Sequence, residues 1–391
     1  MLAYLFAKFP SFTQTFCARE VAALRAEGVN APVFSISRTG AEPIHQNFPG
    51  LGPTTYLPQS FKSRLFWNWA FRRAALSARK DMKTLWGADT EKYRIYEALW
   101  MRRVCRQRGI HHVHTHFVGV GARAAFWLHR LGGIAYSVTA HANDIFRDEP
   151  PERLGQILRA AACVVTVSDF SRRLLARQFP DIEGRLYRVY NGIASDSFPP
   201  AEFPDGPPLI VSIGRAIEKK GFPDLIAACR GLGARGYECV ILGGGPMEAD
   251  LRDSCADLGG KVRILGALSQ EEIRKYLRRA RVFVLPCVTA QDGAMDNLPT
   301  VIMEAMASGL PVISTPLAGI PEMVQDGVTG RLVPERDPIR LAEALSAYLD
   351  DPALARQHGV AGRGACLQHF DISRTAPELI RVFRAHGALA R

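Results

Sequence analysis

Two carboxylates, Asp296 and Glu304, are separated by seven residues. A helical run, Thr300 to Ala307, contains Glu304, begins after Pro299 and ends before Gly309. Proline suits a first helical turn, where its missing N–H costs nothing, and glycine suits a helix end. Free N–H groups at a helix start attract anions such as phosphate. We therefore expect both carboxylates to face one cleft with a phosphate, the alternative being a capping Asp and a solvated helix Glu.

The same segment resembles the acidic signature of retaining glycosyltransferases of family 4. In that signature two acids separated by seven residues precede A-M-A-x-G-x-P-V-I, and here Ala305 to Ile313 reads AMASGLPVI. The downstream run Gly319 to Glu322, GIPE, also matches. The family's first acid is usually Glu. Asp296 is shorter by one methylene, which leaves the donor-sugar preference open.

This resemblance implies how a nucleotide sugar would be held. Glu304 would bind the ribose hydroxyls, and Asp296 would bind hydroxyls of the donor sugar. The backbone and helix start that follow Asp296 would complete the donor site through Asn297, Leu298, Pro299 and Thr300.

A basic loop follows the expected strand Leu209 to Ile213. Its sequence from Gly214 to Gly221, GRAIEKKG, resembles the family's phosphate loop G-R-x-x-x-x-K-G. Arg215 can fork onto diphosphate oxygens, and Lys220 adds a point charge. Fixed cations there would stabilise a leaving group whose charge grows in the transition state. The alternative is an ordinary basic surface loop.

Two further turns are expected near the nucleotide. The run Gly243 to Pro246, GGGP, follows a strand but is not G-x-G-x-x-G, because Glu248 stands at the third glycine position. A nicotinamide fingerprint is therefore poorly supported. By resemblance, Gly244 lies close to the nucleotide, and its base lies against Leu265 and Gly266.

A histidine ends the expected strand Ala135 to Ala140. The sequence TAHANDIF, with His141 and Asp144, resembles the family's T-x-H-x-x-D-I element, in which the histidine touches hydroxyls of the donor sugar. A neutral imidazole donates one hydrogen bond and accepts another, which suits a hydroxyl. The alternative is a structural histidine.

Another pair, His114 and His116, would share one face of a short strand, as metal ligands do. No third ligand is evident from the spacing, so we predict no metal at these residues. One of them is expected to line an acceptor cleft.

The order of strands and helices predicts two parallel α/β domains joined by a linker. The family resemblance implies a GT-B fold: two Rossmann-like domains facing across a cleft, with the C-terminal helix crossing back to the first domain. By the same resemblance, residues 1–198 with 372–391 would bind the acceptor, and residues 209–371 would bind the nucleotide sugar. The linker 199–208 holds six Pro or Gly. An opening loop, Pro10 to Phe16, resembles that of polysaccharide-building members, with Gln14 where Glu is common.

The composition of the chain narrows the expected location and binding partners of the protein. The chain has 391 residues and a net charge of +11, which favours acidic partners. Its eight cysteines form no CxxC pair, so reduced core residues are expected. The first nine residues lack a basic start and a cleavage site, and no run reaches a membrane span. We expect a cytoplasmic protein at the inner face of the membrane.

Residues 59–108 are basic and rich in aromatic residues. Thirteen Lys or Arg stand against four Asp or Glu between Lys62 and Arg108. Basic helices with Trp and Phe favour contact with anionic membranes, and no nucleic-acid motif accompanies them. The other interpretation, two amphipathic helices covering a sheet, is compatible with membrane contact.

The sequence thus predicts a metal-independent retaining hexosyltransferase. It would move a sugar from a UDP- or GDP-type donor to a lipid-linked or polysaccharide precursor, with no cofactor. A nucleotide-sugar epimerase of the same fold and a non-catalytic nucleotide-sugar or polyanion-binding protein are the alternatives.

Overall fold

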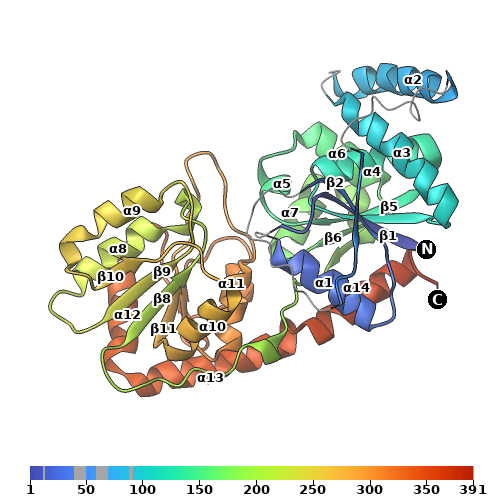
Figure 1. The fold of residues 1–391 in the computed structure, drawn as a ribbon. Helices are drawn as coiled ribbons and strands as arrows, with labels where there is room; N and C mark the ends of the chain where they lie inside the picture. Colours follow the sequence, from blue (N-terminus) through green and yellow to red (C-terminus); the bar gives the residue numbers. More distant parts are fainter. Residues whose placement is uncertain (12–13, 39–49, 59–68, 88–90, 391) are drawn as a thin grey trace. The chain divides into compact units, whose positions relative to one another are not determined.

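A computed structural model describes residues 1–11, 14–38, 50–58, 69–87 and 91–390. The chain divides into two compact units. Unit 1 contains Met1–Val167, Arg172–Val189 and Thr375–Arg391, and unit 2 contains Ser168–Ser171 and Tyr190–Arg374. Figure 1 shows that each unit is built around its own sheet with helices on both faces.

The sheet of unit 1 is parallel and runs in the order β3-β2-β1-β4-β5-β6-β7. The strands are β1 (Leu2–Lys8), β2 (Val33–Ser37), β3 (Thr54–Tyr56), β4 (His112–His116), β5 (Ala135–Ala140), β6 (Cys163–Thr166) and β7 (Leu186–Arg188). The helices are α1 (Thr15–Ala26), α2 (Trp69–Trp86), α3 (Lys92–Arg108), α4 (Val120–Gly132), α5 (Asn143–Phe146), α6 (Pro151–Ala160), α7 (Asp169–Gln178) and α14 (Ile372–Ala385).

Side chains of β1 show how this sheet is buried on both faces. Ala3 and Leu5 join one apolar cluster, while Tyr4 and Phe6 join another. This alternation is the two-residue period of a strand. The first cluster takes in α3, α4 and α6, and the second takes in α1 and α14. The last helix therefore packs on unit 1, as the sequence predicts.

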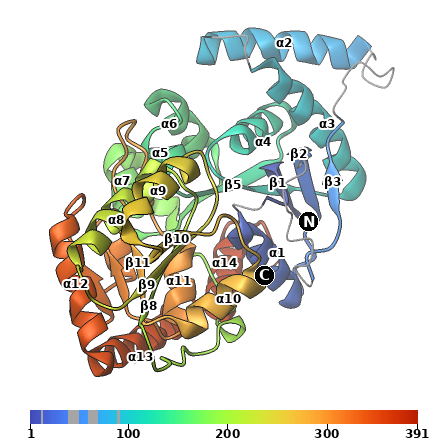
Figure 2. The same cartoon turned by 60° about the vertical axis from the view of Figure 1, so that its left-hand side comes forward.

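Unit 2 has a second parallel sheet in the order β10-β9-β8-β11-β12-β13. Its strands are β8 (Leu209–Ile213), β9 (Glu238–Leu242), β10 (Val262–Ile264), β11 (Val282–Leu285), β12 (Val312–Ser314) and β13 (Gly330–Leu332). Its helices are α8 (Phe222–Gly231), α9 (Glu248–Ser254), α10 (Gln270–Arg279), α11 (Thr300–Ala307), α12 (Pro338–Asp350) and α13 (Pro352–His369). Figure 2 gives a second view of these elements. Two Rossmann-like units of this kind are the predicted fold class.

The sequence predicts a helix near residues 316–325, and this prediction is wrong. The structure has only the 3₁₀ helix Ile320–Glu322 there. Pro321 at its start lacks an N–H, and Thr329 rather than a helical carbonyl satisfies the local backbone by accepting from the N–H of Gln325 at 2.8 Å.

Two helices, α2 and α3, occupy the described part of the basic aromatic stretch 59–108, which is the number that the amphipathic interpretation expects, but α2 packs on α3. Figures 1 and 2 both show α2 beyond α3, farther from the sheet. Phe66 and Trp67 of that stretch fall outside the described residues.

All eight cysteines are buried and free, which confirms the core assignment. Within the described ranges, every helix is too short or too polar to span a bilayer.

Candidate functional site

The strand order of unit 2 reverses between β8 and β11, which are neighbours in the sheet but far apart in sequence. Chain connections leave in opposite directions at such a switch point, and the loops after the two strands form a natural ligand site. The loop after β8 carries Arg215, Lys219 and Lys220. The loop after β11 carries Asp296. The topology thus brings together the predicted basic loop and the first acid of the signature.

These two loops meet in a compact ion cluster. The carboxylate of Asp296 accepts from Lys220 Nζ at 2.5 Å and lies 2.9 Å from Lys219 Nζ. The Cys287 thiol lies 3.6 Å from the same carboxylate. Lys219, which the sequence interpretation did not single out, shares Asp296 because it also faces this loop, with its Nζ 3.5 Å from the carbonyl of Met295.

The groups of this cluster shift the pKa values of Asp296 and Lys220. Burial alone would raise the pKa of Asp296, but Lys220 and Lys219 outweigh it and lower the pKa to about 2. Burial alone would lower the pKa of Lys220, and the Asp296 carboxylate reverses that effect and raises it. The cluster therefore keeps the Asp296 carboxylate and the Lys220 ammonium charged at neutral pH.

Close backbone contacts fix the basic loop. Gly221, at φ +66°, follows Lys220, and a Cβ there would lie 1.8 Å from the carbonyl oxygen of Pro286. Gly243, at the end of β9, would likewise place a Cβ 1.9 Å from the oxygen of Gly214. The loop after β8 thus packs closely against the backbone that follows β9 and β11. Only glycine permits such a close approach of two backbone segments.

Arg215 extends from this loop and is exposed. It lies close enough to Lys220 to disfavour the charge on that lysine. Positive charge at the switch point is thus concentrated beyond what Asp296 neutralises.

The residues after Asp296 that the sequence predicts as donor contacts lie at the start of α11. Asn297 is buried, and its side chain exchanges hydrogen bonds with Ser168 at 2.8 Å and Ser171 at 2.9 Å. These contacts occupy its amide, so a donor role would pass through its backbone. Pro299 is the N-cap residue, one position earlier than the first-turn placement that the sequence predicts, and Thr300 opens the helix.

Glu304 lies in the second turn of α11 and is 2% exposed. Leu298 is buried beside the start of that helix. Gly309, at φ +68°, follows the helix end as predicted.

The two remaining turns, which the sequence predicts to lie near a nucleotide, are at the ends of β9 and β10. The N–H of Gly243 donates to the carbonyl of Gly266 at 2.6 Å, and the N–H of Ala216 donates to the carbonyl of Gly244 at 3.0 Å. Leu265 bonds back to Ile241 of β9. These bonds tie the turns after β8, β9 and β10 into one edge of the sheet.

In unit 1 the histidine of the T-x-H-x-x-D-I element follows β5, as predicted. Asp144 is buried and accepts from the backbone N–H groups of His141, Ala142 and Val118. It thereby joins the ends of β4 and β5 and fixes the position of His141. The His141 ring is 4% exposed and lies 4.4 Å from the ring of Phe117.

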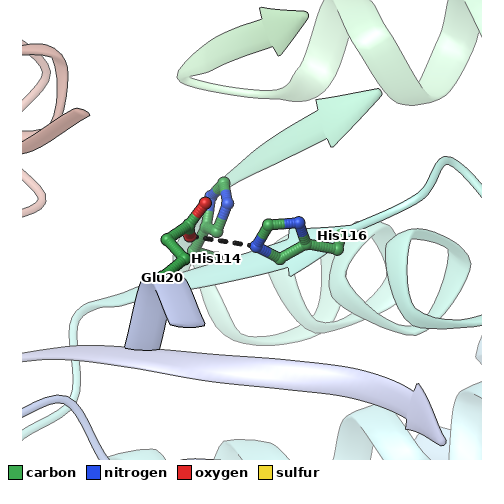
Figure 3. A group of neighbouring side chains, drawn as sticks. All are labelled: Glu20, His114 and His116. Carbon is green, nitrogen blue, oxygen red and sulfur yellow. Dashed lines mark hydrogen bonds and ion pairs between the residues drawn. The ribbon is translucent and has the colours of Figure 1, made fainter. Parts of the chain in front are cut away.

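A carboxylate joins the histidine pair of β4. Glu20 on α1 offers an oxygen 3.0 Å from His116 Nε2, and Figure 3 shows this contact beside His114. Ligand atoms of Glu20, His114 and His116 lie within 4.8 Å of one another. The sequence interpretation found no third ligand because Glu20 precedes His116 by 96 residues. Both histidines are buried.

Comparison with known proteins identifies the family of this chain. A model described as Glycosyltransferase Family 4 matches residues 13–197, and one described as Glycosyl transferases group 1 matches residues 195–364. The alpha-maltose-1-phosphate synthase of Mycobacterium tuberculosis is 30% identical over 70% of this chain and 78% of its own length. The chain belongs to glycosyltransferase family 4.

Other relatives of this glycosyltransferase match over shorter stretches. The amylovoran biosynthesis glycosyltransferase AmsK of Erwinia amylovora is 46% identical over 36% of the chain and 34% of AmsK. The putative colanic acid biosynthesis glycosyltransferase WcaL of Escherichia coli is 35% identical over 58% of the chain and 57% of WcaL. The match thus spans about a third of AmsK and over half of WcaL.

Solved structures share the fold of the glycosyltransferase. A glycosyltransferase from Rickettsia africae gives a TM-score of 0.75 at 15% identity, covering 98% of both chains. Anabaena Alr3699/HepE in complex with UDP also gives 0.75 at 15% identity, covering 98% of this chain and 100% of its own. Both support the GT-B assignment.

Proposed function

We propose that this glycosyltransferase moves a hexose from a UDP- or GDP-type sugar to a hydroxyl of a lipid-linked or polysaccharide precursor, with retention at the anomeric carbon. Unit 2 would bind the donor and unit 1 the acceptor. The polysaccharide class is supported by AmsK and WcaL, whose names refer to amylovoran and colanic acid biosynthesis.

The cluster of Lys219, Lys220 and Asp296 at the switch point carries this proposal. A diphosphate entering there would meet two ammonium groups and the Arg215 guanidinium. Asp296 already holds the lysines, so their amines are preorganised before the donor arrives. As the diphosphate takes over the lysines, Asp296 would turn to the hydroxyls of the donor sugar.

The chemistry follows from charge. The bond between the anomeric carbon and the β-phosphate oxygen breaks, and the electron pair stays on the phosphate. Arg215 and Lys220 stabilise that growing charge. The departing phosphate oxygen then takes the proton of the acceptor hydroxyl on the same face as the new bond forms. The lysines and arginine fill the role that a divalent cation has in other transferases, so we propose metal-independent transfer.

A donor-binding screen tests the proposal. We expect UDP or GDP and its sugar conjugates, but not all bases equally, to raise the melting temperature by several degrees at saturating concentration with EDTA present. Arg215→Ala should lose most of this shift, because a forked phosphate contact disappears.

Three results would contradict the proposal. Absence of any shift at millimolar nucleotide would favour the non-catalytic alternative. Release of an altered nucleotide sugar without acceptor would favour an epimerase. A shift that disappears with EDTA would refute metal independence.

Membrane contact is proposed for α2. Arg73, Lys80 and Lys83 lie on one exposed face of that helix, and Leu76 beside them is 66% exposed. Residues spaced by three, four and seven share a helix face. This face would lie on anionic headgroups and bring the enzyme to a lipid-linked acceptor.

Charge reversal tests this contact. Each basic residue near an anionic leaflet contributes about 1 kcal/mol, so changing Arg73, Lys80 and Lys83 to Glu should weaken binding to phosphatidylglycerol vesicles by about 100-fold or more. Cosedimentation measures the bound fraction. The matched control changes three exposed basic residues of unit 2 to Glu: Arg263, Lys275 and Arg279. Equal losses in both triple variants would refute a specific role for α2.

A further inference from the structure

The chain that joins β11 to α11 and carries Asp296 is long for an α/β unit. This β11–α11 connection runs from Pro286 to Pro299, whereas such loops usually have roughly two to six residues. Connections of such length are usually functional. Near its end the connection is held at the basic loop, because Asp296 contacts Lys219 and Lys220. Contacts in the middle of the connection therefore bear on the placement of Asp296.

Glu218 holds the middle of the β11–α11 connection. The backbone N–H of Gln291 donates to both carboxylate oxygens of Glu218, each at 3.2 Å. Glu218, Lys219 and Lys220 are the three residues of one 3₁₀ turn in the loop after β8. This turn therefore holds the connection at two points, at Gln291 through Glu218 and at Asp296 through the lysines.

The loop after β13 adds two further contacts. The Glu335 carboxylate accepts from the backbone N–H of Thr289 at 2.5 Å, and the Arg336 guanidinium donates to the carbonyl of Thr289 at 2.8 Å. Arg336 also pairs with Glu218 at 3.1 Å. Its backbone lies in the left-handed region at φ +57°, which is uncommon for a residue with a side chain. The Arg336 side chain thus joins the loops that follow β8, β11 and β13.

A carboxylate is unexpected in a loop that is proposed to bind a diphosphate. Like charges repel, so Glu218 would weaken donor binding unless its charge is compensated, and Arg336 supplies that compensation. An exposed ion pair by itself contributes little to stability, and the side chains of Glu218 and Arg336 are 36% and 53% exposed. The contacts of this pair with the backbone of Thr289 and Gln291 explain its presence better than its charges do.

We propose that Glu218 and Arg336 are positioning residues that hold the β11–α11 connection so that Asp296 reaches the lysines of the basic loop. This inference rests on the proposed function, in which Asp296 and the two lysines act on the donor. Neither Glu218 nor Arg336 would touch substrate. Their effect is to fix the backbone of Thr289 and Gln291, which restricts the positions open to Asp296.

Hydrogen–deuterium exchange tests the positioning without an activity measurement. In the full chain, Glu218→Ala should speed exchange in a peptide covering residues 288–296 by about tenfold or more, because Gln291 loses its acceptor. Glu218→Gln keeps an amide oxygen that can accept from Gln291, so its change should be smaller. The matched control is Glu343→Ala on α12, which removes a carboxylate from an exposed pair with Arg340 at 2.8 Å. This control should leave the peptide unchanged.

Kinetics separates positioning from charge. Glu218→Ala should lower kcat by about 10- to 100-fold, because a small misplacement of a reacting group costs this much. Donor KM should stay the same or fall, since a negative charge leaves the basic loop. Glu218→Gln should recover part of the lost kcat. If Glu218 acted only through its charge, the Ala and Gln variants would behave alike and neither would lower kcat.

A double-mutant cycle tests whether Glu218 and Arg336 act as one unit. Arg336→Ala should also lower kcat. The double variant should lose less than the product of the two single losses, because both residues hold the same connection. The control cycle changes Glu343 and Arg340 to Ala, singly and together, and kcat should stay unchanged in all three control variants.

Any of three results would overturn the positioning role. These are unchanged exchange of residues 288–296 in Glu218→Ala, an unchanged kcat in that variant, and fully independent losses in the double-mutant cycle. Failure of the proposed function gives a different result: exchange of residues 288–296 still rises in Glu218→Ala, but the unmodified chain transfers no sugar from any donor.

Discussion

Lys220→Ala should lower kcat for sugar transfer by about 100- to 1,000-fold. Removing one preorganised group that stabilises transition-state charge typically costs this much. Lys220 Nζ lies 2.5 Å from Asp296 and is held charged beside the proposed diphosphate site. Acceptor KM should change far less, because the lysine belongs to the donor side of the reaction. Initial rates at saturating donor with varied acceptor measure both quantities.

The control for Lys220 is Lys275→Ala, which removes the same charge from an exposed pair with Glu271 on α10. Its kcat should equal that of the unmodified enzyme. Asp296 retains Lys219 at 2.9 Å in the Lys220 variant, so the fold should survive, and circular dichroism checks this. Turnover within threefold of the unmodified enzyme would remove Lys220 from the phosphate site.

Much of unit 2 could be predicted because its local signals agree with its tertiary contacts. The run Thr300 to Ala307 has the helical pattern and a glycine stop, and α11 has the predicted bounds. Strand β8 is a buried run that is apolar except for Ser212, and it also matches the prediction at both ends. Ser269 and Glu272 have the spacing that predicts a capping box, and this box forms at the start of α10. In each case one short segment holds all the information needed.

Helix α13 was not predicted, because its composition contradicts its structure. It contains Gly359, Gly362 and Gly364, which are poor helix formers. The reason lies elsewhere in the chain: a Cβ at Gly359 would lie 2.0 Å from the carbonyl oxygen of Gly309. The glycine permits α13 to approach the end of α11, and sequence patterns do not reveal such a contact.

Some residues of the candidate site could be predicted from the sequence and others could not. Arg215, Lys220, Asp296 and His141 are recognisable because short motifs surround them. Glu20 carries no motif, and its contact with His116 appears only when the fold brings α1 beside β4. Side chains that meet only through tertiary folding are generally of this second kind, since their spacing in sequence is arbitrary.

Gly221→Ala should have the largest effect on stability. At φ +66° an alanine costs about 1–2 kcal/mol. Its Cβ would also lie 1.8 Å from the Pro286 oxygen, and such overpacking adds about 1–3 kcal/mol. The backbone must shift to relieve the clash, and Lys220 precedes this residue directly. The variant should therefore lose transfer activity along with stability.

Gly233→Ala isolates the clash. Gly233 has a similar φ of +62°, but a Cβ there would meet nothing within 4 Å. It should show only the conformational cost and keep full kcat, since it lies after α8 and away from the basic loop. Urea midpoints measured side by side give the difference between the two variants. Equal destabilisation by both would mean that the close approach of Gly221 to Pro286 does not hold the loop, and the preorganisation of Lys219 and Lys220 would need another cause.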